Sequence, residues 1–424
     1  MPELVKNYSN GSAIKIVYSV SQNVSKNQST VTMTLYVHRD SYGPSWNTHC
    51  NSYIQLDGAN VMTYTGSFRI STSWVKIGST VSKTVTHNSD GTKTIALKGF
   101  FDSQGLTTKL DDLTVTGNVT LKTIPRASKV SGVSGSTIGS PITVSISREV
   151  SGFTHKVYYS FGSVKDRLLG SNVGTSLTFT PPMEDCGQVP NSTSGTATIR
   201  VDTYNGSTKI GSSSKNITLK VPSSVVPTMT GISFTPINGQ VPAGWEIYVQ
   251  TKSKVTAKIT GAAGAYGSTI KSYSISGGGY SGTSSSLTTG FLNKAGSISF
   301  TAKITDSRGR TATKTASISV EEYAPPVLSL AKAFRCNEQG EEQDDGAYLS
   351  LTLQFSGHDL GGKNAITGGY RTQAEEGSWS GLSPAENGKA VIFPANPDLT
   401  LTVQAQAADT FGEVTKDLTV NSTR

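Results

Sequence analysis

Carboxylates are the side chains of this sequence that could carry catalysis. Paired Asp or Glu groups hydrolyse glycosidic bonds, one as acid and the other as base or nucleophile, and they need to meet only in space. The first 122 residues hold five candidates: Asp57, Asp90, Asp102, Asp111 and Asp112. Nothing in the sequence around these aspartates resembles the active site of a glycosidase. We therefore predict that the chain is not an enzyme, and a glycan hydrolase remains the alternative.

Motifs of other catalytic classes are missing from the sequence. It contains no Gly-x-Ser-x-Gly nucleophile elbow, no phosphate-binding Walker loop and no His-Glu-x-x-His zinc motif. The glycine-rich run at 277–282 is not followed by a helical pattern that could cradle phosphate, so we interpret it as a loop. We therefore expect no cofactor.

Metal ligands are sparse as well. Cys50, Cys186 and Cys336 are far apart, so we expect free thiols rather than a disulfide framework. His49 adjoins Cys50, but neighbouring residues of a strand point to opposite faces. The acidic run at 338–345 lies in Gln- and Gly-rich sequence that is typical of a solvated loop, with weak Ca²⁺ binding as the alternative. We predict no metal site.

Aromatic residues on loops offer a binding surface instead. Tyr42 and Trp46 lie in the turn-rich segment 40–50, and Trp74 lies in a short polar segment between predicted strands. Aromatic faces held on loops can stack on sugar rings or on a protein partner, whereas buried aromatics fill small β cores. We predict a binding surface made of Tyr42, Trp46 and Trp74 in the N-terminal domain, and core packing is the alternative.

The composition indicates an all-β chain. Of 424 residues, 58 are Ser, 54 are Thr and 44 are Gly, and only 16% are charged, so long surface helices are poorly supported. Short runs such as 31–37 alternate apolar and polar residues, which is the pattern of half-buried strands. No stretch of about 18 apolar residues exists, so we expect no membrane span. Residues 1–10 lack the apolar core of a secretory signal, so we expect no Sec export.

Proline-marked breaks at 123–128, 221–227 and 321–327 divide the chain into four parts. Each of the last three parts ends in a strand, a turn and a returning strand, with an aspartate near the turn. These aspartates, Asp202, Asp306 and Asp409, are 104 and 103 positions apart, which suits immunoglobulin-like sandwiches of roughly 100 residues. We expect an Asx-type turn at each, because Asp bonds the backbone two residues on.

The predicted architecture is an N-terminal antiparallel β-sandwich, jelly-roll-like, followed by three immunoglobulin-like β-sandwiches in a row. The predicted domains span residues 1–122, 129–221, 227–321 and 326–424. Within the first domain, Asn88-Ser-Asp90-Gly91 predicts a tight hairpin turn, since Asp-Gly tolerates positive φ angles.

The charge excludes one class of partner. A formal net charge of +8 comes from 37 basic and 29 acidic residues that are spread over many predicted strands. Nucleic-acid binders gather their positive charge on one face or along one helix. We therefore expect no nucleic-acid partner.

The junction Leu121-Lys-Thr-Ile-Pro-Arg-Ala-Ser128, with the 85–95 hairpin before it and the repeats after it, resembles a family of minor structural proteins of tailed siphophages that infect Gram-positive bacteria. The resemblance covers most of the chain, and the junction and hairpin are its most specific part. It implies a virion protein on the tail or another projection, assembled in the host cytoplasm and released by lysis.

We therefore predict a non-enzymatic bacteriophage virion structural protein, a tail-associated or fibre-like projection. Its expected partners are other tail proteins, and host attachment through cell-wall polysaccharide stays open, as does a homo-oligomeric state. No heptads or collagen-like repeats supply a trimerisation device. Besides the hydrolase, a bacterial surface adhesin of immunoglobulin-like repeats is the competing interpretation.

Overall fold

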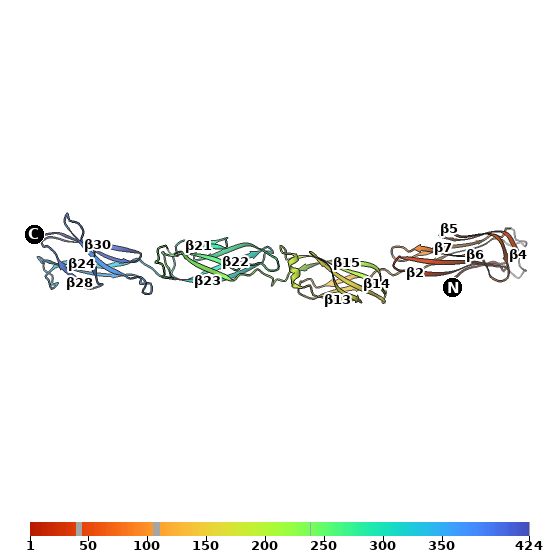
Figure 1. Ribbon diagram of the computed structural model, residues 1–424, viewed down its shortest axis with the longest axis horizontal. Helices are drawn as coiled ribbons and strands as arrows, with labels where there is room; N and C mark the ends of the chain where they lie inside the picture. Colours follow the sequence, from red (N-terminus) through yellow and green to blue (C-terminus); the bar gives the residue numbers. More distant parts are fainter. Residues whose placement is uncertain (40–44, 105–110, 238, 424) are drawn as a thin grey trace. The chain divides into compact units, whose positions relative to one another are not determined.

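The chain forms two compact units built almost wholly of β-strands (Figure 1). The computed structural model describes residues 1–39, 45–104, 111–237 and 239–423, with the backbone alone at 45–50 and 68. One unit comprises Met1–Val189 and Thr193–Pro222, and the other comprises Pro190–Ser192 and Ser223–Arg424. Within these described residues, four sheets lie in each unit.

The first two sheets of the N-terminal unit each contain four antiparallel strands. A jelly roll likewise has eight strands in two sheets. One sheet has the order β1 (Glu3–Asn7), β2 (Ala13–Asn23), β3 (Gln28–His38), β6 (Val75–Thr86). The other has the order β5 (Ala59–Ile70), β4 (Ser45–Leu56), β7 (Thr94–Phe101), β8 (Leu113–Thr120). Alternate residues of β3, among them Val31, Met33 and Leu35, are fully buried in the shared core. The period-two pattern thus sends the intervening threonines to the outer face.

The Asn88–Gly91 turn forms as predicted, but the hairpin prediction is wrong. Gly91 has φ +88°, and Asp90 Oδ1 accepts the Thr92 N–H at 2.9 Å. The strands on either side, β6 and β7, belong to different sheets, so the turn carries the chain from one sheet to the other. Local turn chemistry was readable from the sequence, whereas the pairing partners of the two strands were not.

The connector after this sandwich is held at both ends. The Ile124 N–H donates to Gly91 O at 2.9 Å, and Arg126 Nη2 donates to Asn88 O at 2.8 Å. Further on, Ser128 Oγ lies 2.8 Å from Nε2 of the buried His155. The Ile-Pro-Arg-Ala-Ser segment is therefore a bonded part of the fold rather than a free spacer.

The second pair of sheets completes the N-terminal unit. Its smaller sheet has the order β13 (Ser176–Phe179), β10 (Ile142–Ser147), β9 (Lys129–Ser134). Its larger sheet has the order β12 (Val164–Val173), β11 (Phe153–Phe161), β14 (Ser194–Asn205), β15 (Thr208–Lys220). A 3₁₀ helix at Met183–Gln188 places Cys186 in the interior, where it is a thiol outside any disulfide, as expected.

The second unit repeats this arrangement twice. Its first two sheets have the orders β16 (Gly231–Ile237), β18 (Lys254–Thr260), β21 (Ser286–Thr288) and β17 (Tyr248–Val249), β23 (Thr311–Glu321), β22 (Gly296–Asp306), β19 (Ile270–Gly277), β20 (Tyr280–Gly282). Its last two have the orders β24 (Val327–Cys336), β25 (Tyr348–Ser356), β28 (Ala390–Pro394) and β27 (Ser383–Ala385), β26 (Thr367–Ala374), β29 (Leu401–Asp409), β30 (Gly412–Val420). Apart from β17 alongside β23, these pairings are antiparallel. Cys336 is the second buried thiol.

The three repeated aspartates do not all form the predicted turn. Asp306 Oδ1 accepts the N–H groups of Arg308 and Arg310 at 3.0 and 2.9 Å. Asp409 Oδ1 likewise accepts the Phe411 N–H at 2.8 Å, so both are Asx turns. Asp202 instead lies within β14 and bonds side chains only, so the Asx prediction is wrong there.

No helix among the described residues has the length and apolar character that crossing a membrane requires.

Candidate functional site

Trp74 ends the short loop that leads from β5 to β6, and it is the one member of the predicted aromatic surface whose side chain the structure describes. The indole is 37% exposed, which is high for a large aromatic residue. The Arg39 N–H donates to Ser71 O at 2.9 Å, which ties the end of β3 to the beginning of this loop. Trp74 therefore projects from backbone that is fixed on both sides.

Two side chains from the outer face of the sheet hold the indole. Lys15 Nζ lies 4.3 Å from the Trp74 ring centroid, and the His38 ring meets it edge-on at 4.5 Å with an interplanar angle of 82°. Glu3 binds Lys15 Nζ at 2.9 Å and keeps the ammonium in place. A cation over a tryptophan face contributes about 1 kcal/mol, so the orientation of the indole is set before any ligand arrives.

The other two predicted aromatics are only partly placed. Trp46 begins β4, where its backbone pairs with Arg69 of β5, and its side chain lies outside the described residues. Tyr42 also lies outside the described residues. Because β5 ends at Ile70, opposite Ser45, the backbone of Trp46 and the loop of Trp74 share one end of the sandwich.

Hydroxyl side chains on the same outer face were missed by sequence reasoning. Thr32 Oγ1 lies 2.8 Å from Ser82 Oγ, and Thr30 pairs with Thr84 at an O–O distance of 3.4 Å. A further pair, Thr34 with Thr80 at 3.0 Å, is not part of the exposed surface, because Thr34 is buried and Thr80 Oγ1 accepts Lys76 Nζ. The alternation in β3 predicted that its threonines face outward, but only the β3–β6 register reveals their partners. We call the four residues Thr30, Thr32, Ser82 and Thr84 the hydroxyl ladder.

Four of the five carboxylates considered for a hydrolase site bind backbone. Each accepts an N–H at 2.8–2.9 Å: Asp57 from Ala96, Asp90 from Thr92, Asp102 from Gln104 and Asp112 from Ser103. The fifth, Asp111, is exposed. Hydrogen bonds from Thr92 lower the pKa of Asp90. A general acid in glycoside hydrolysis requires a raised pKa, so Asp90 is poorly suited to that role.

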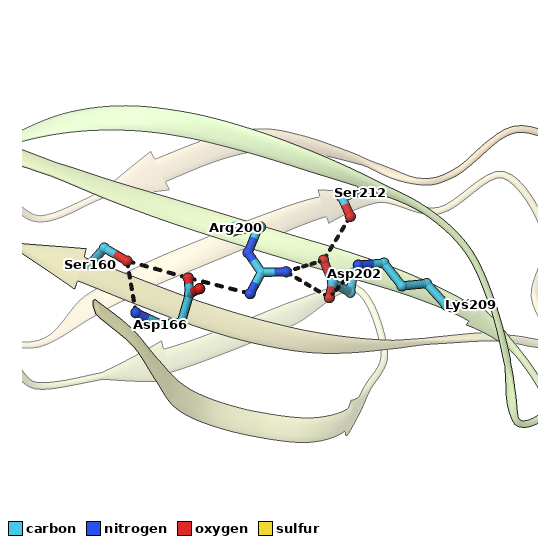
Figure 2. A network of polar contacts seen from close by, with 6 residues as sticks. All are labelled: Ser160, Asp166, Arg200, Asp202, Lys209 and Ser212. Carbon is cyan, nitrogen blue, oxygen red and sulfur yellow. Dashed lines mark hydrogen bonds and ion pairs between the residues drawn. The ribbon is translucent and has the colours of Figure 1, made fainter. Parts of the chain in front are cut away.

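A charged cluster of ion pairs surrounds Asp202 (Figure 2). Arg200 Nη1 lies 2.7 Å from both Asp202 carboxylate oxygens, and Lys209 Nζ lies 2.8 Å from Oδ2. Burial favours a raised pKa for Asp202, but the hydrogen bonds from Lys209, Ser212 and Arg200 outweigh it and lower the pKa. Asp166 adds a contact to Arg200 at 3.3 Å. The cluster is internally neutralised, which fits a structural role.

A second buried carboxylate is satisfied in the same way. Asp185 is 2% exposed, and Arg167 binds it through two N–O contacts of 3.0 and 3.1 Å. Tyr159 donates its hydroxyl to Asp185 at 3.0 Å. Burial and the neighbouring Asp185 charge raise the pKa of Tyr159, so the phenol stays protonated.

The acidic run at 338–345 forms a hydrogen-bonded loop. Asn337 Nδ2 donates to Glu341 Oε2 at 2.9 Å, and Gln343 Nε2 donates to Asp345 Oδ1 at 2.8 Å. Within the described part of the chain, no three or more His, Cys, Asp or Glu side chains gather closely enough to hold a metal ion.

The remaining tryptophans lie in the second unit. Trp245 packs edge-on against Phe411, with ring centroids 5.8 Å apart, in a small apolar cluster. Trp379 resembles Trp74 in carrying a cation over its ring, because the Arg371 guanidinium lies 4.6 Å from its centroid. Trp379 is half-buried, as Trp74 nearly is. The two sites differ in their surroundings, because the hydroxyl ladder belongs to the first sandwich, which carries Trp74.

The fold defines an all-β protein of tandem sandwiches, with the exposed Trp74 at one end of the first of them. A family model described as "Siphovirus protein of unknown function" matches residues 1–342. The chain therefore belongs to this siphovirus protein family.

Solved structures similar to this chain are tandem β-domain proteins. The tetra-tandem repeat from the extending region of a large adhesion protein is 11% identical, with 96% of this chain and 99% of that chain covered and a TM-score of 0.30. A Ca²⁺-stabilised adhesin with which an Antarctic bacterium binds ice is 12% identical, with 95% and 94% covered and a TM-score of 0.34. Immunoglobulin domains 1–5 of Sidekick-1 are 11% identical, with 99% and 95% covered and a TM-score of 0.28. At these scores the similarities carry no functional inference. A search of curated proteins found no match.

Proposed function

We propose that this chain is a non-enzymatic structural protein of the siphovirus virion, a tail-associated or fibre-like projection made of four domains at 1–122, 129–221, 227–321 and 326–424. Membership of the siphovirus family supports a virion location. The satisfied carboxylates of the first sandwich support a binding role over hydrolysis. Other tail proteins are its proposed partners, and assembly takes place in the host cytoplasm with release by lysis.

The first sandwich, in this proposal, attaches to polysaccharide on the host surface through Trp74. One observation carries the proposal: the indole is exposed, and Lys15 and His38 fix its orientation. A sugar ring presents a face of C–H groups that can stack on an aromatic ring, and a preordered ring loses little conformational entropy on binding. Trp46 and Tyr42 are proposed to extend the same surface.

The test uses the full chain, intact host cells and wall polysaccharide purified from that host. We expect Trp74→Ala to weaken binding at least about tenfold, as loss of a central aromatic anchor does. Trp379→Ala is the matched control, because it removes the other tryptophan that carries a cation over its ring, and it should bind like the wild type. Unchanged binding by the Trp74 variant would overturn the site.

The same samples test the absence of catalysis. Polysaccharide incubated with the wild-type chain should keep its length distribution. Shortened fragments that disappear on substitution of Asp102 or Asp112 would show that the hydrolase alternative is correct.

A further inference from the structure

The hydroxyl ladder forms an ordered array on the exposed face of the first sandwich. The register of β2, β3 and β6 places its side chains in rows: Ser19 opposite Thr32 and Ser82, and then Ser21 opposite Thr30 and Thr84. Successive rows are two residues apart, roughly 7 Å along the strand. Two rows lie between this array and the end that carries Trp74: the row of Lys15, Tyr36 and Lys76, and the row of Val17 and the buried Thr34.

Pairing fixes these hydroxyls and leaves them able to bind. When two hydroxyls share one hydrogen bond, one O–H is consumed, and the other O–H and several lone pairs stay available. Threonine has a restricted χ1, and the contact between Thr32 and Ser82 at 2.8 Å restricts it further. The ladder therefore offers donors and acceptors whose positions are already set, which lowers the entropic cost of binding.

The chemistry of these rows favours one class of ligand. The rows made of Ser19, Thr32 and Ser82, of Ser21, Thr30 and Thr84, and of Asn23, Gln28 and Thr86 contain no charged side chain. They also lack the aromatic, Met and Arg anchors that protein interfaces use. A neutral polymer rich in hydroxyls complements such a face, because each of its hydroxyls can both donate and accept.

We infer that the hydroxyl ladder continues the Trp74 site and binds an uncharged, linear stretch of polysaccharide that lies along β3. This inference rests on the proposed function and adds a ligand class and a direction. One sugar ring stacks on Trp74, the chain crosses the row of Lys15, and later units exchange hydrogen bonds with the ladder from the Thr32 row toward the Thr30 row. Affinity then increases with the length of the polysaccharide until the ladder is covered.

The experiment measures binding of length-graded fragments of the wall polysaccharide to the full chain. Fragments long enough to pass Trp74 should bind the wild type progressively more tightly. The double variant Thr30→Val and Thr32→Val keeps side-chain shape and removes two hydroxyls. It should lose about tenfold in affinity for long fragments and almost none for the shortest fragment that binds.

A matched control exists in the second sandwich, where Thr143 Oγ1 and Thr178 Oγ1 form an exposed cross-strand pair at 2.8 Å. The double variant Thr143→Val and Thr178→Val should bind all fragments like the wild type. Thermal unfolding should show that both double variants remain folded.

The outcomes distinguish the ladder inference from the proposed function, polysaccharide binding through Trp74. If Trp74→Ala abolishes binding while the ladder variant keeps the full length dependence, the ladder inference is wrong and the proposed function stands. If the wild type binds no fragment and no host cell, both fail. If the ladder variant loses affinity equally for fragments of all lengths, the polysaccharide does not lie along β3.

Discussion

The turn after Asp202 and the turn after Asp306 come from the same sequence repeat, yet the two aspartates bind different partners. Asp306 ends β22 and uses one oxygen to accept two backbone N–H groups of the turn. Asp202 lies three residues before the end of β14 and accepts bonds from the side chains of Arg200, Lys209 and Ser212. One residue fixes a turn, and the other joins two strands across the face of a sheet.

One inserted residue accounts for the difference. Asp306 is followed by glycine after two intervening residues, whereas Asp202 is separated from Gly206 by three. The extra residue lengthens β14 beyond Asp202, so the N–H groups that an Asx turn would use belong to the sheet. A register shift between Thr203 and Tyr204 absorbs the insertion. The same aspartate of the repeat thus has a different role when the length of the turn changes.

The largest effect that separates the two positions should come from Asp202→Asn. This change removes the charge that Arg200 and Lys209 face, and we expect a loss of about 1 to 2 kcal/mol, moderated because both cations reach solvent. Amide hydrogen exchange of β14 and β15 in the full chain measures it. Equal protection in variant and wild type would mean that the ion pairs contribute nothing.

Acidification should reproduce part of that loss without any mutation. The folded-state pKa of Asp202 is lowered, so its stabilisation is present above the unfolded value of about 3.9 and is lost as the pH falls through the folded-state pKa. The protection of the β14 and β15 amides, measured relative to their intrinsic exchange rate at each pH, should decrease on going from about pH 6 to about pH 3. The Asp202→Asn chain should lack this decrease.

The smallest effect is expected for Asp306→Asn. The asparagine oxygen can keep both bonds to the turn, and Asp306 Oδ2 accepts no hydrogen bond among the described residues. We expect a change of less than about 0.5 kcal/mol, measured by exchange of the β22 and β23 amides. A loss as large as that at Asp202 would show that the charge of Asp306 matters and would remove the contrast.

Much of the fold could be predicted because it is encoded locally. The alternation in 31–37 and the Asp-Gly pair at 90–91 identified a strand and a turn whose residues interact with near neighbours. What failed was non-local: β6 and β7 join different sheets, a fact that depends on pairing with β3 and β4 far away in sequence. Strand partners follow from tertiary packing, which no short window contains.

The candidate site shows the same division. Trp74 could be singled out because an aromatic residue in a polar loop is unusual. The residues that give it a defined orientation, Lys15 and His38, lie on other strands, far from Trp74 in the sequence. The hydroxyl ladder was half visible, since Thr30 and Thr32 alternate with core residues, while Ser82 and Thr84 could be matched to them only through the register.

The two buried thiols have a consequence for the chemical ageing of the protein. Cys186 and Cys336 are fully buried, and burial raises the pKa of Cys336, so this sulfur stays a protonated thiol. Oxidants and disulfides react with exposed thiolates. The fold therefore shields these two sulfurs from oxidation, and neither should cross-link one copy of the chain to another during storage in air.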